Sequence, residues 1–163
     1  NVNYLPGATV AGLALVALDG DDAVCVSASA PVDVVVDLMA TFAADGALAF
    51  QPGVGRLLDT RSGAGGWLGR PSARQALDVG VAPPEAVAVS GTLIAVAPNA
   101  PSFVAVGPTG ADPATATTSN VNADTGAVVA NAFTVAAPDG RVALFGRAAG
   151  HVVLDVAGWW LPA

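Results

Sequence analysis

Few side chains in this sequence have the chemistry of a catalytic site. The only histidine is His151, and hydrolysis of the Ser-His-Asp type needs a base beside the nucleophile. No G-x-S-x-G motif is present. A glycosidase needs two carboxylates that face one cleft, whereas this chain has a single glutamate and aspartates that lie mostly in turns or at strand ends. The sequence therefore predicts that the protein is not an enzyme.

Side chains that could bind a metal are also sparse. Asp19, Asp21 and Asp22 could give oxygen ligands to Ca²⁺, but a solvated turn explains the same cluster. Cys25 and His151 supply only two soft ligands, too few for zinc. The glycine-rich G-A-G-G-W-L-G lacks the lysine and the helix of a phosphate-binding loop. We expect no metal and no cofactor.

Five residues are candidates for binding: Asp59, Arg61, Trp67, Trp159 and Trp160. Asp59 and Arg61 flank a threonine, so in a strand they point the same way and could form an ion pair or reach a partner. Trp67 lies among glycines and could fold back as a lid or stand exposed. Trp159 and Trp160 are adjacent, so in a strand one faces inward and one outward. Such rings could bind a sugar, contact a protein or close a core.

Composition limits the function classes. The chain of 163 residues is 53% hydrophobic and 12% charged, which fits one globular domain rather than a disordered segment. The net charge of -7 argues against nucleic acid and against anionic membranes, because both require a basic surface. No apolar run reaches the roughly 20 residues of a membrane span, so we expect no membrane insertion.

Apolar runs separated by turn residues predict the elements that hold these side chains. Residues 10–18 and 24–26 flank D-G-D-D and predict a hairpin. Residues 86–96 and 103–106 flank P-N-A-P and predict another, and a third turns at P-D-G. Residues 43–55 have little periodicity and predict a linker. The fold prediction is an all-β protein, an antiparallel β-sandwich or barrel built from hairpins, with a β-trefoil as the alternative.

The start and the end of the chain resemble each other. N-V-N, D-G and V-V-V-D in residues 1–42 correspond to N-V-N, D-G and V-V-L-D in residues 120–160, and roughly sixteen of about forty positions are identical. We therefore predict a single domain, residues 1–163, in which this internal repeat surrounds a middle section, residues 43–119. The two copies should superpose as similar β units, with Asp37 and Asp155 in equivalent places accepting hydrogen bonds.

The order of four motifs carries a family resemblance. R-L-L-D-T-R, S-N-V-N, P-D-G and V-V-L-D-V-A-G-W-W resemble a repeat module of secreted and cell-surface proteins of actinobacteria. Residues 56–160 are similar to one complete unit, and residues 1–42 to the second half of another, which closes on D-L-M-A-T-F without the glycine. The resemblance implies export and an accessory role, with no chemistry of its own.

These observations lead to an expected function. We expect a secreted, extracellular or cell-surface module with a structural or interaction role, whose partner is itself or another surface protein. The alternative is a carbohydrate-binding module that uses Trp67 and one of Trp159 and Trp160 to recognise a glycan. Residues 1–42 need partners for their strands. They could close on residues 56–106 within the chain, which we expect together with lateral self-contact, or complete a neighbouring molecule.

Overall fold

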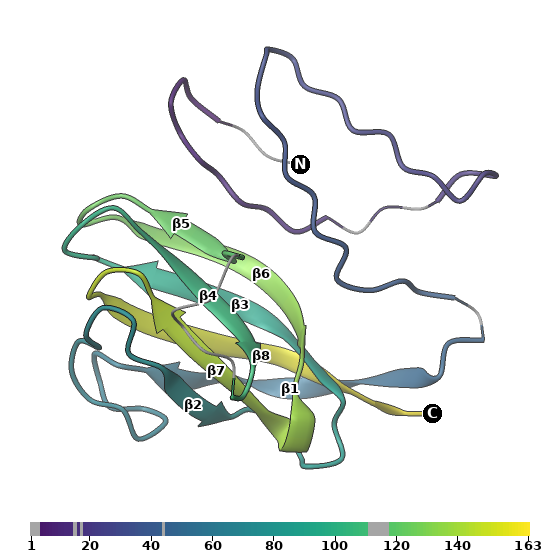
Figure 1. The fold of residues 1–163 in the computed structure, drawn as a ribbon. Coiled ribbons are helices and arrows are strands. Elements are labelled where there is room, and N and C mark those ends of the chain that lie inside the picture. The colour runs from purple at the N-terminus through teal and green to yellow at the C-terminus, as the bar shows by residue number, and fades with distance from the viewer. Residues whose placement is uncertain (1–3, 15, 17, 44, 111–117) are drawn as a thin grey trace.

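A computed structural model describes residues 4–14, 16, 18–43, 45–110 and 118–163 (Figure 1). Within these residues eight strands and one short 3-10 turn, η1 (Pro138–Gly140), are present. The strands are β1 (Leu48–Asp59), β2 (Leu77–Gly80), β3 (Ala88–Val96), β4 (Ser102–Pro108), β5 (Val121–Ala123), β6 (Val128–Ala136), β7 (Arg141–Gly146) and β8 (His151–Pro162).

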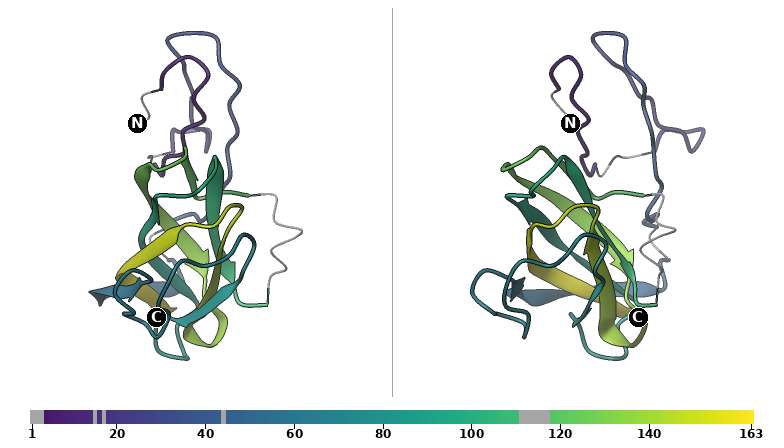
Figure 2. Two further views of the ribbon diagram at one scale, coloured as in Figure 1. Left: turned by 90° about the vertical axis from the view of Figure 1, so that its left-hand side faces the viewer. Right: turned by 60° about the vertical axis from the view of Figure 1, so that its left-hand side comes forward.

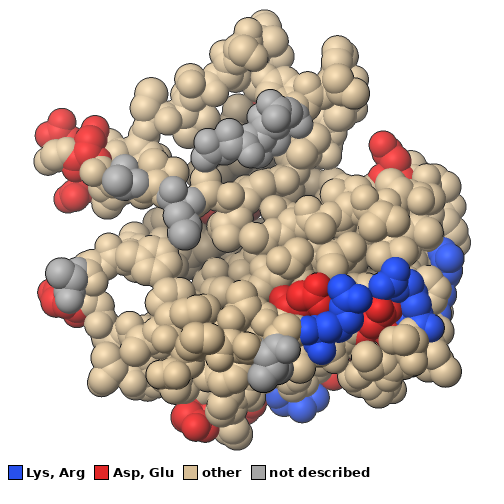
Figure 3. Space-filling view, turned by 180° about the vertical axis from the view of Figure 1, so that it is seen from behind, with Lys and Arg blue, Asp and Glu red and all other residues tan. Residues whose placement is uncertain are grey.

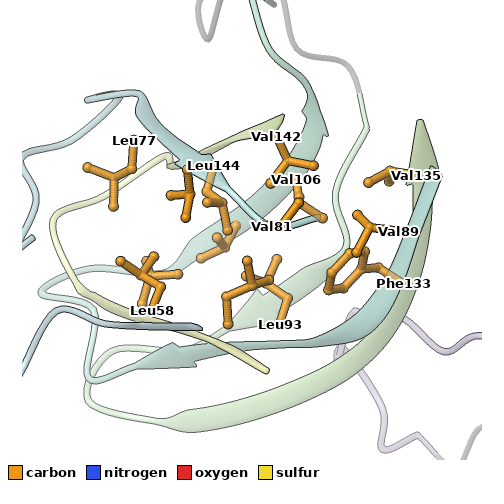
Figure 4. Packing of buried hydrophobic residues seen from close by; sticks show 14 of the residues in the cluster. Leu58, Leu77, Val81, Val89, Leu93, Val106, Phe133, Val135, Val142 and Leu144 are labelled. Atoms are coloured by element: carbon orange, nitrogen blue, oxygen red, sulfur yellow. The ribbon is translucent and has the colours of Figure 1, made fainter. Parts of the chain in front are cut away.

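The strands form two antiparallel sheets that face each other (Figures 1 and 2). One sheet has the order β1-β8-β3-β6 and the other β2-β7-β4-β5. Their apolar side chains meet in one core, in which Leu58, Leu93 and Phe133 of the first sheet point toward Leu77 and Leu144 of the second (Figure 4). The predicted all-β antiparallel sandwich is confirmed, and the β-trefoil alternative is wrong because the strands form two separate four-stranded sheets.

Alternation of side chains explains why these segments are strands. In β3, Val89, Gly91, Leu93 and Ala95 are buried, while the residues that alternate with them are only partly covered. Successive side chains of a strand point to opposite faces, so a period of two gives one face to the core and leaves the other outside. The branched residues also favour extended backbone.

The predicted hairpins at P-N-A-P and P-D-G are wrong. β3 lies in the first sheet and β4 in the second, and the same is true of β6 and β7. Each pair is therefore joined by an arch that crosses the core. The described strands that are consecutive in the chain and also paired are β4 and β5. Alternation predicts which face of a strand is apolar, but it does not distinguish two strands that pair edge to edge from two that stack face to face.

Gly140 shows why the P-D-G segment forms an arch. Asp139 and Gly140 both have positive φ, 54° and 68°. The carbonyl oxygen of Gly140 accepts hydrogen bonds from the backbone N–H groups of Val81 and Ala82, at 2.8 and 3.1 Å. A β-carbon on Gly140 would lie 2.2 Å from the carbonyl oxygen of Ala82. The turn is therefore fixed against the segment that follows β2 and does not return into its own sheet.

The two halves of the sandwich interleave. We call β1–β4 (residues 48–108) the front half and β5–β8 (residues 121–162) the back half. Each of the six ladders between these strands joins a front-half strand to a back-half strand. No two strands of the back half are neighbours in either sheet. Each half alone would leave the backbone hydrogen-bonding groups of its strands without their partners.

The prediction that residues 1–42 form a β unit like residues 120–160 is wrong. The described residues from 4 to 43 contain no strand and run as open loops to one side of the sandwich (Figures 1 and 2). If residues 1–42 folded like the back half, their strands would need front-half strands as neighbours. The front half is already paired with residues 121–162. The expected self-closure on residues 56–106 is wrong for the same reason. The sandwich occupies residues 48–162 of the predicted domain 1–163.

Smaller predictions for the first copy have mixed outcomes. The turn at D-G-D-D is present: the Oδ1 atom of Asp19 accepts hydrogen bonds from the backbone N–H groups of Asp21 and Ala23, both at 2.9 Å. These bonds lower the pKa of Asp19, the bond from Ala23 most strongly. The N-V-N of residues 1–3 lies outside the described residues. The predicted linker 43–55 is wrong in its second part, because β1 begins at Leu48.

Candidate functional site

The R-L-L-D-T-R motif forms an ion-pair cluster where β1 ends. Asp59 is the last residue of β1, and its side chain is 7% exposed. Arg61 donates to this carboxylate from Nε at 2.9 Å and from Nη2 at 2.7 Å, and its backbone N–H donates at 3.0 Å. The predicted ion pair between Asp59 and Arg61 is confirmed. The carboxylate is thus saturated by a neighbour two residues away.

A second bidentate pair extends the cluster across the sheet. Arg56 donates from Nε and Nη2 to the two carboxylate oxygens of Asp155 at 2.8 and 3.0 Å, and its Nη1 lies 3.6 Å from Asp59 Oδ2. Arg56 and Asp155 are directly opposite each other in β1 and β8. This contact confirms the expectation that Asp155 accepts hydrogen bonds from arginine or backbone. Sequence reasoning did not select Arg56, which lies 99 positions from its partner.

The contacts in the cluster shift the pKa values of Asp59, Arg56 and Arg61. The Arg61 guanidinium holds the pKa of the Asp59 carboxyl well below its usual range, against the opposing effect of burial. The Asp155 carboxylate raises the pKa of Arg56, and the Asp59 carboxylate raises that of Arg61. These shifts favour the charged forms of Asp59, Arg56 and Arg61, and each of the three has an oppositely charged partner. Figure 3 shows basic and acidic side chains lying side by side on a surface that is otherwise mostly uncharged.

Thr60 connects this cluster to the start of β8. Its side chain is fully buried, its Oγ1 accepts a hydrogen bond from the backbone N–H of Val152 at 3.0 Å, and it lies 3.0 Å from Nδ1 of His151. A threonine and a histidine in contact are the components of nucleophilic catalysis. Here the hydroxyl is out of reach of solvent and already bonded to the backbone, so the contact joins the loop after β1 to β8. Sequence reasoning missed Thr60, because nothing near it signals a partner 91 residues away.

Trp67 folds back onto the sandwich. It lies in the loop of residues 60–69, which is closed by a hydrogen bond from the Gly69 N–H to the Thr60 carbonyl oxygen at 2.8 Å. The indole is partly buried and packs against the core. Of the two predicted arrangements, the folded-back ring is therefore the one present. Only part of its surface faces solvent.

Trp159 and Trp160 occupy opposite faces of β8, as their adjacency predicts. Trp159 packs against the core. Trp160 lies on the outside, where its ring centroid is 5.0 Å from that of Phe50 and 5.3 Å from that of Phe42. Its Nε1–H donates to the Ser90 hydroxyl at 2.9 Å. Trp160 thus holds the end of the N-terminal segment against the sandwich.

The candidate residues do not form one site. In the pairing of β1 with β8, Asp59 lies opposite Val153 and Phe50 lies opposite Trp160, so the ion-pair cluster and the Trp160 cluster are near opposite ends of the same ladder. Asp59, Arg61 and Trp67 belong to the end where β8 begins, and the two adjacent tryptophans belong to the other end. The candidates therefore make two separate clusters, and each is held mainly by contacts within the protein.

The sandwich also carries a groove on its surface. Among the described residues, no group of three or more His, Cys, Asp and Glu side chains is placed to hold a metal ion. None of them forms a helix long and apolar enough to cross a membrane. A shallow groove is lined by Pro84, Glu85, Val87, Pro108 and Pro138, among others.

Comparison with known proteins gives no relative. No protein-family model, no curated protein and no solved structure matches the chain.

The largest uncovered feature is the N-terminal segment, the described residues from 4 to 43. Its large apolar side chains face solvent: Val35 is 86% exposed, Leu38 80% and Val36 68%. Exposed apolar side chains gathered in one region of a soluble protein mark candidate sites of contact with another molecule. Sequence reasoning identified residues 1–42 as strands in need of partners, and the residues that the structure describes within this range form no strand.

Proposed function

We propose that this protein is a secreted, non-enzymatic structural and interaction module of the cell surface, acting through protein–protein contacts. The N-terminal segment is its main contact region. The observation that carries the proposal is the exposure of Val35, Val36 and Leu38 and their apolar neighbours in a segment that the sandwich leaves uncovered. Burial of apolar surface favours association, and the exposed apolar side chains of this segment offer such surface to a partner.

The chemistry of the sandwich supports a role without catalysis. Thr60 is buried and His151 is in contact with it, while the Asp59 carboxylate is saturated by arginine. A nucleophile must reach its substrate and a general base must be able to take up a proton. The resemblance of R-L-L-D-T-R and the later motifs to modules of secreted and surface proteins supports the location.

A carbohydrate-binding role has less support. A sugar platform needs a ring face open to solvent, but Trp67 and Trp159 pack against the core, and Trp160 contacts two phenylalanine rings. Binding of the protein to a glycan array or to purified cell wall, lost in Trp67→Ala while the protein stays folded, would favour this alternative over the proposed one.

Self-association of the full chain tests the proposed function. Light scattering over a range of concentrations should show a mass above that of the monomer at high concentration. A Val35→Glu, Leu38→Glu double variant should remain monomeric, because the charges oppose burial of the segment. Leu68→Glu is the matched control: Leu68 is 79% exposed but lies in the loop after β1, so association should persist. A wild-type chain that is monomeric at every concentration, and that binds no apolar dye, would contradict the proposal.

A further inference from the structure

The N-terminal segment corresponds in sequence to the back half of the sandwich, with roughly sixteen of about forty positions identical. Residues 34–36 match residues 152–154, which lie near the start of β8. In β8 these side chains are 3%, 1% and 0% exposed, whereas their counterparts in residues 34–36 are 55%, 86% and 68% exposed. The same apolar pattern that is fully covered in one copy is therefore largely bare in the other.

The topology explains what the bare copy lacks. β8 lies between β1 and β3, β6 pairs with β3, β7 lies between β2 and β4, and β5 pairs with β4. Every neighbour of a back-half strand belongs to the front half. A back half alone lacks the neighbours from which these ladders are built, so the described residues from 4 to 43 lie in loops although their sequence favours strands.

A charged residue adds a specific requirement. Asp37 corresponds to Asp155, whose carboxylate is held by the Arg56 guanidinium in the neighbouring strand. Asp37 itself is exposed. A complementary strand should therefore offer an arginine opposite Asp37, as β1 offers Arg56 to Asp155.

Copies of this chain cannot supply the missing half by strand pairing. Residues 1–163 hold one front half and two back-half sequences, so an exchange of halves between copies of these residues leaves one back half uncovered in each copy. The chain's own front half is also a poor fit. Ala40 stands where β8 has Gly158, and a β-carbon at Gly158 would lie 2.2 Å from the Gln51 carbonyl oxygen. Residues 121–162 therefore fit the front half better than residues 1–42 do.

We propose that residues 1–42 are the back half of a second sandwich, and that their partner is a further front half of the β1–β4 type. This partner carries an R-L-L-D-T-R-like strand with an arginine for Asp37, and it leaves room opposite Ala40. The inference rests on the proposed function, because it names the partner of the same contact segment. The partner is thus a polypeptide that resembles residues 48–108, and binding joins the two by interleaved strands.

An extended chain tests this inference. A second copy of residues 43–119 is joined directly ahead of Asn1, so that the connection equals the natural one between Ser119 and Asn120. Ala40→Gly is included because the added front half has the same Gln51 carbonyl. Amide hydrogen exchange in residues 4–43 should slow by at least about 100-fold relative to the unextended chain, since these amides become part of ladders. An extension of the same composition in scrambled order should give no protection.

Two variants of the extended chain test the register. Arg56→Glu in the added copy alone should reduce the protection, and Asp37→Arg combined with it should restore protection. With Ala40 retained, the protection should be smaller than with Ala40→Gly.

Unchanged exchange in residues 4–43 of the extended chain, with residues 48–162 still protected, would overturn the inference. If the unextended chain self-associates and Val35→Glu, Leu38→Glu abolishes this, the proposed function survives that result. Protection that does not respond to either charge variant would also overturn the proposed strand register, and with it the assignment of the partner.

Discussion

Substitution of Gly140 by alanine tests the arch between β6 and β7. Gly140 has a φ of +68°, and a β-carbon there would lie 2.2 Å from the Ala82 carbonyl oxygen and 2.6 Å from that of Pro83. Both neighbours are backbone atoms, so relief requires movement of the segment that follows β2. Gly126 is the matched control, because its φ is +74° and a β-carbon there has no atom within 4 Å.

The structure separates two contributions to the effect. Left-handed backbone destabilises alanine relative to glycine by about 1–2 kcal/mol, and this applies to Gly140→Ala and Gly126→Ala alike. Movement of residues 82–83 also weakens two hydrogen bonds to the Gly140 carbonyl, from Val81 and Ala82, each worth about 0.5–1.5 kcal/mol. Gly140→Ala should therefore lower the free energy of unfolding by about 2–5 kcal/mol, and Gly126→Ala by only about 1–2 kcal/mol.

Urea unfolding followed by tryptophan fluorescence measures the difference. All three tryptophans of the chain, Trp67, Trp159 and Trp160, lie in the sandwich, so the signal reports its unfolding. Gly20→Ala, at the equivalent place in the first copy, should change the free energy of unfolding by less than about 0.5 kcal/mol, because a β-carbon there meets open space. Equal effects of Gly140→Ala and Gly126→Ala would refute the reasoning, because they would mean that the backbone of residues 82–83 does not restrict the turn at Gly140.

Three further predictions concern the two clusters. Arg61 lowers the pKa of Asp59 in the folded protein from an ordinary value of 3.8, so the unfolded chain takes up the proton first as the pH falls. The stability that this pair contributes is therefore complete above that value and declines below it. Asp59→Asn should flatten the decline of the unfolding free energy between about pH 5 and 2 in urea titrations, and parallel pH profiles of variant and wild type would contradict this prediction. Thr60→Val leaves the Val152 N–H buried without an acceptor and should lower the free energy of unfolding by about 1–3 kcal/mol. Thr60→Ser keeps the hydroxyl, so it should speed hydrogen exchange of the Val152 amide less than Thr60→Val does. Trp160→Phe removes the N–H that donates to the Ser90 hydroxyl and should lower the free energy of unfolding by about 0.5–1.5 kcal/mol in urea. An unchanged free energy of unfolding would contradict this prediction and would mean that water replaces the bond at no cost.

Local sequence was sufficient to identify the ion pair of the L-D-T-R motif. Asp59 and Arg61 are two residues apart, and a short turn brings their side chains together without any help from the rest of the fold. Their long-range partners could not be found in this way. The contacts of Arg56 with Asp155 and of Thr60 with His151 join positions more than ninety residues apart, and they exist because β1 and β8 are neighbours in the sheet.

The sequence by itself determined the all-β class, the apolar face of segments such as residues 88–96, and the turn residues between them, because alternation and turn chemistry act within a few residues. Tertiary structure decided the rest. Whether β3 and β4 pair or stack depends on which strands occupy the positions beside them, and the arches put them in different sheets. The N-terminal segment has a strand-forming pattern like that of β6, β7 and β8, yet its described residues form no strand. The backbone hydrogen bonds of a sheet require a neighbouring strand, and every neighbour of a back-half strand belongs to the front half.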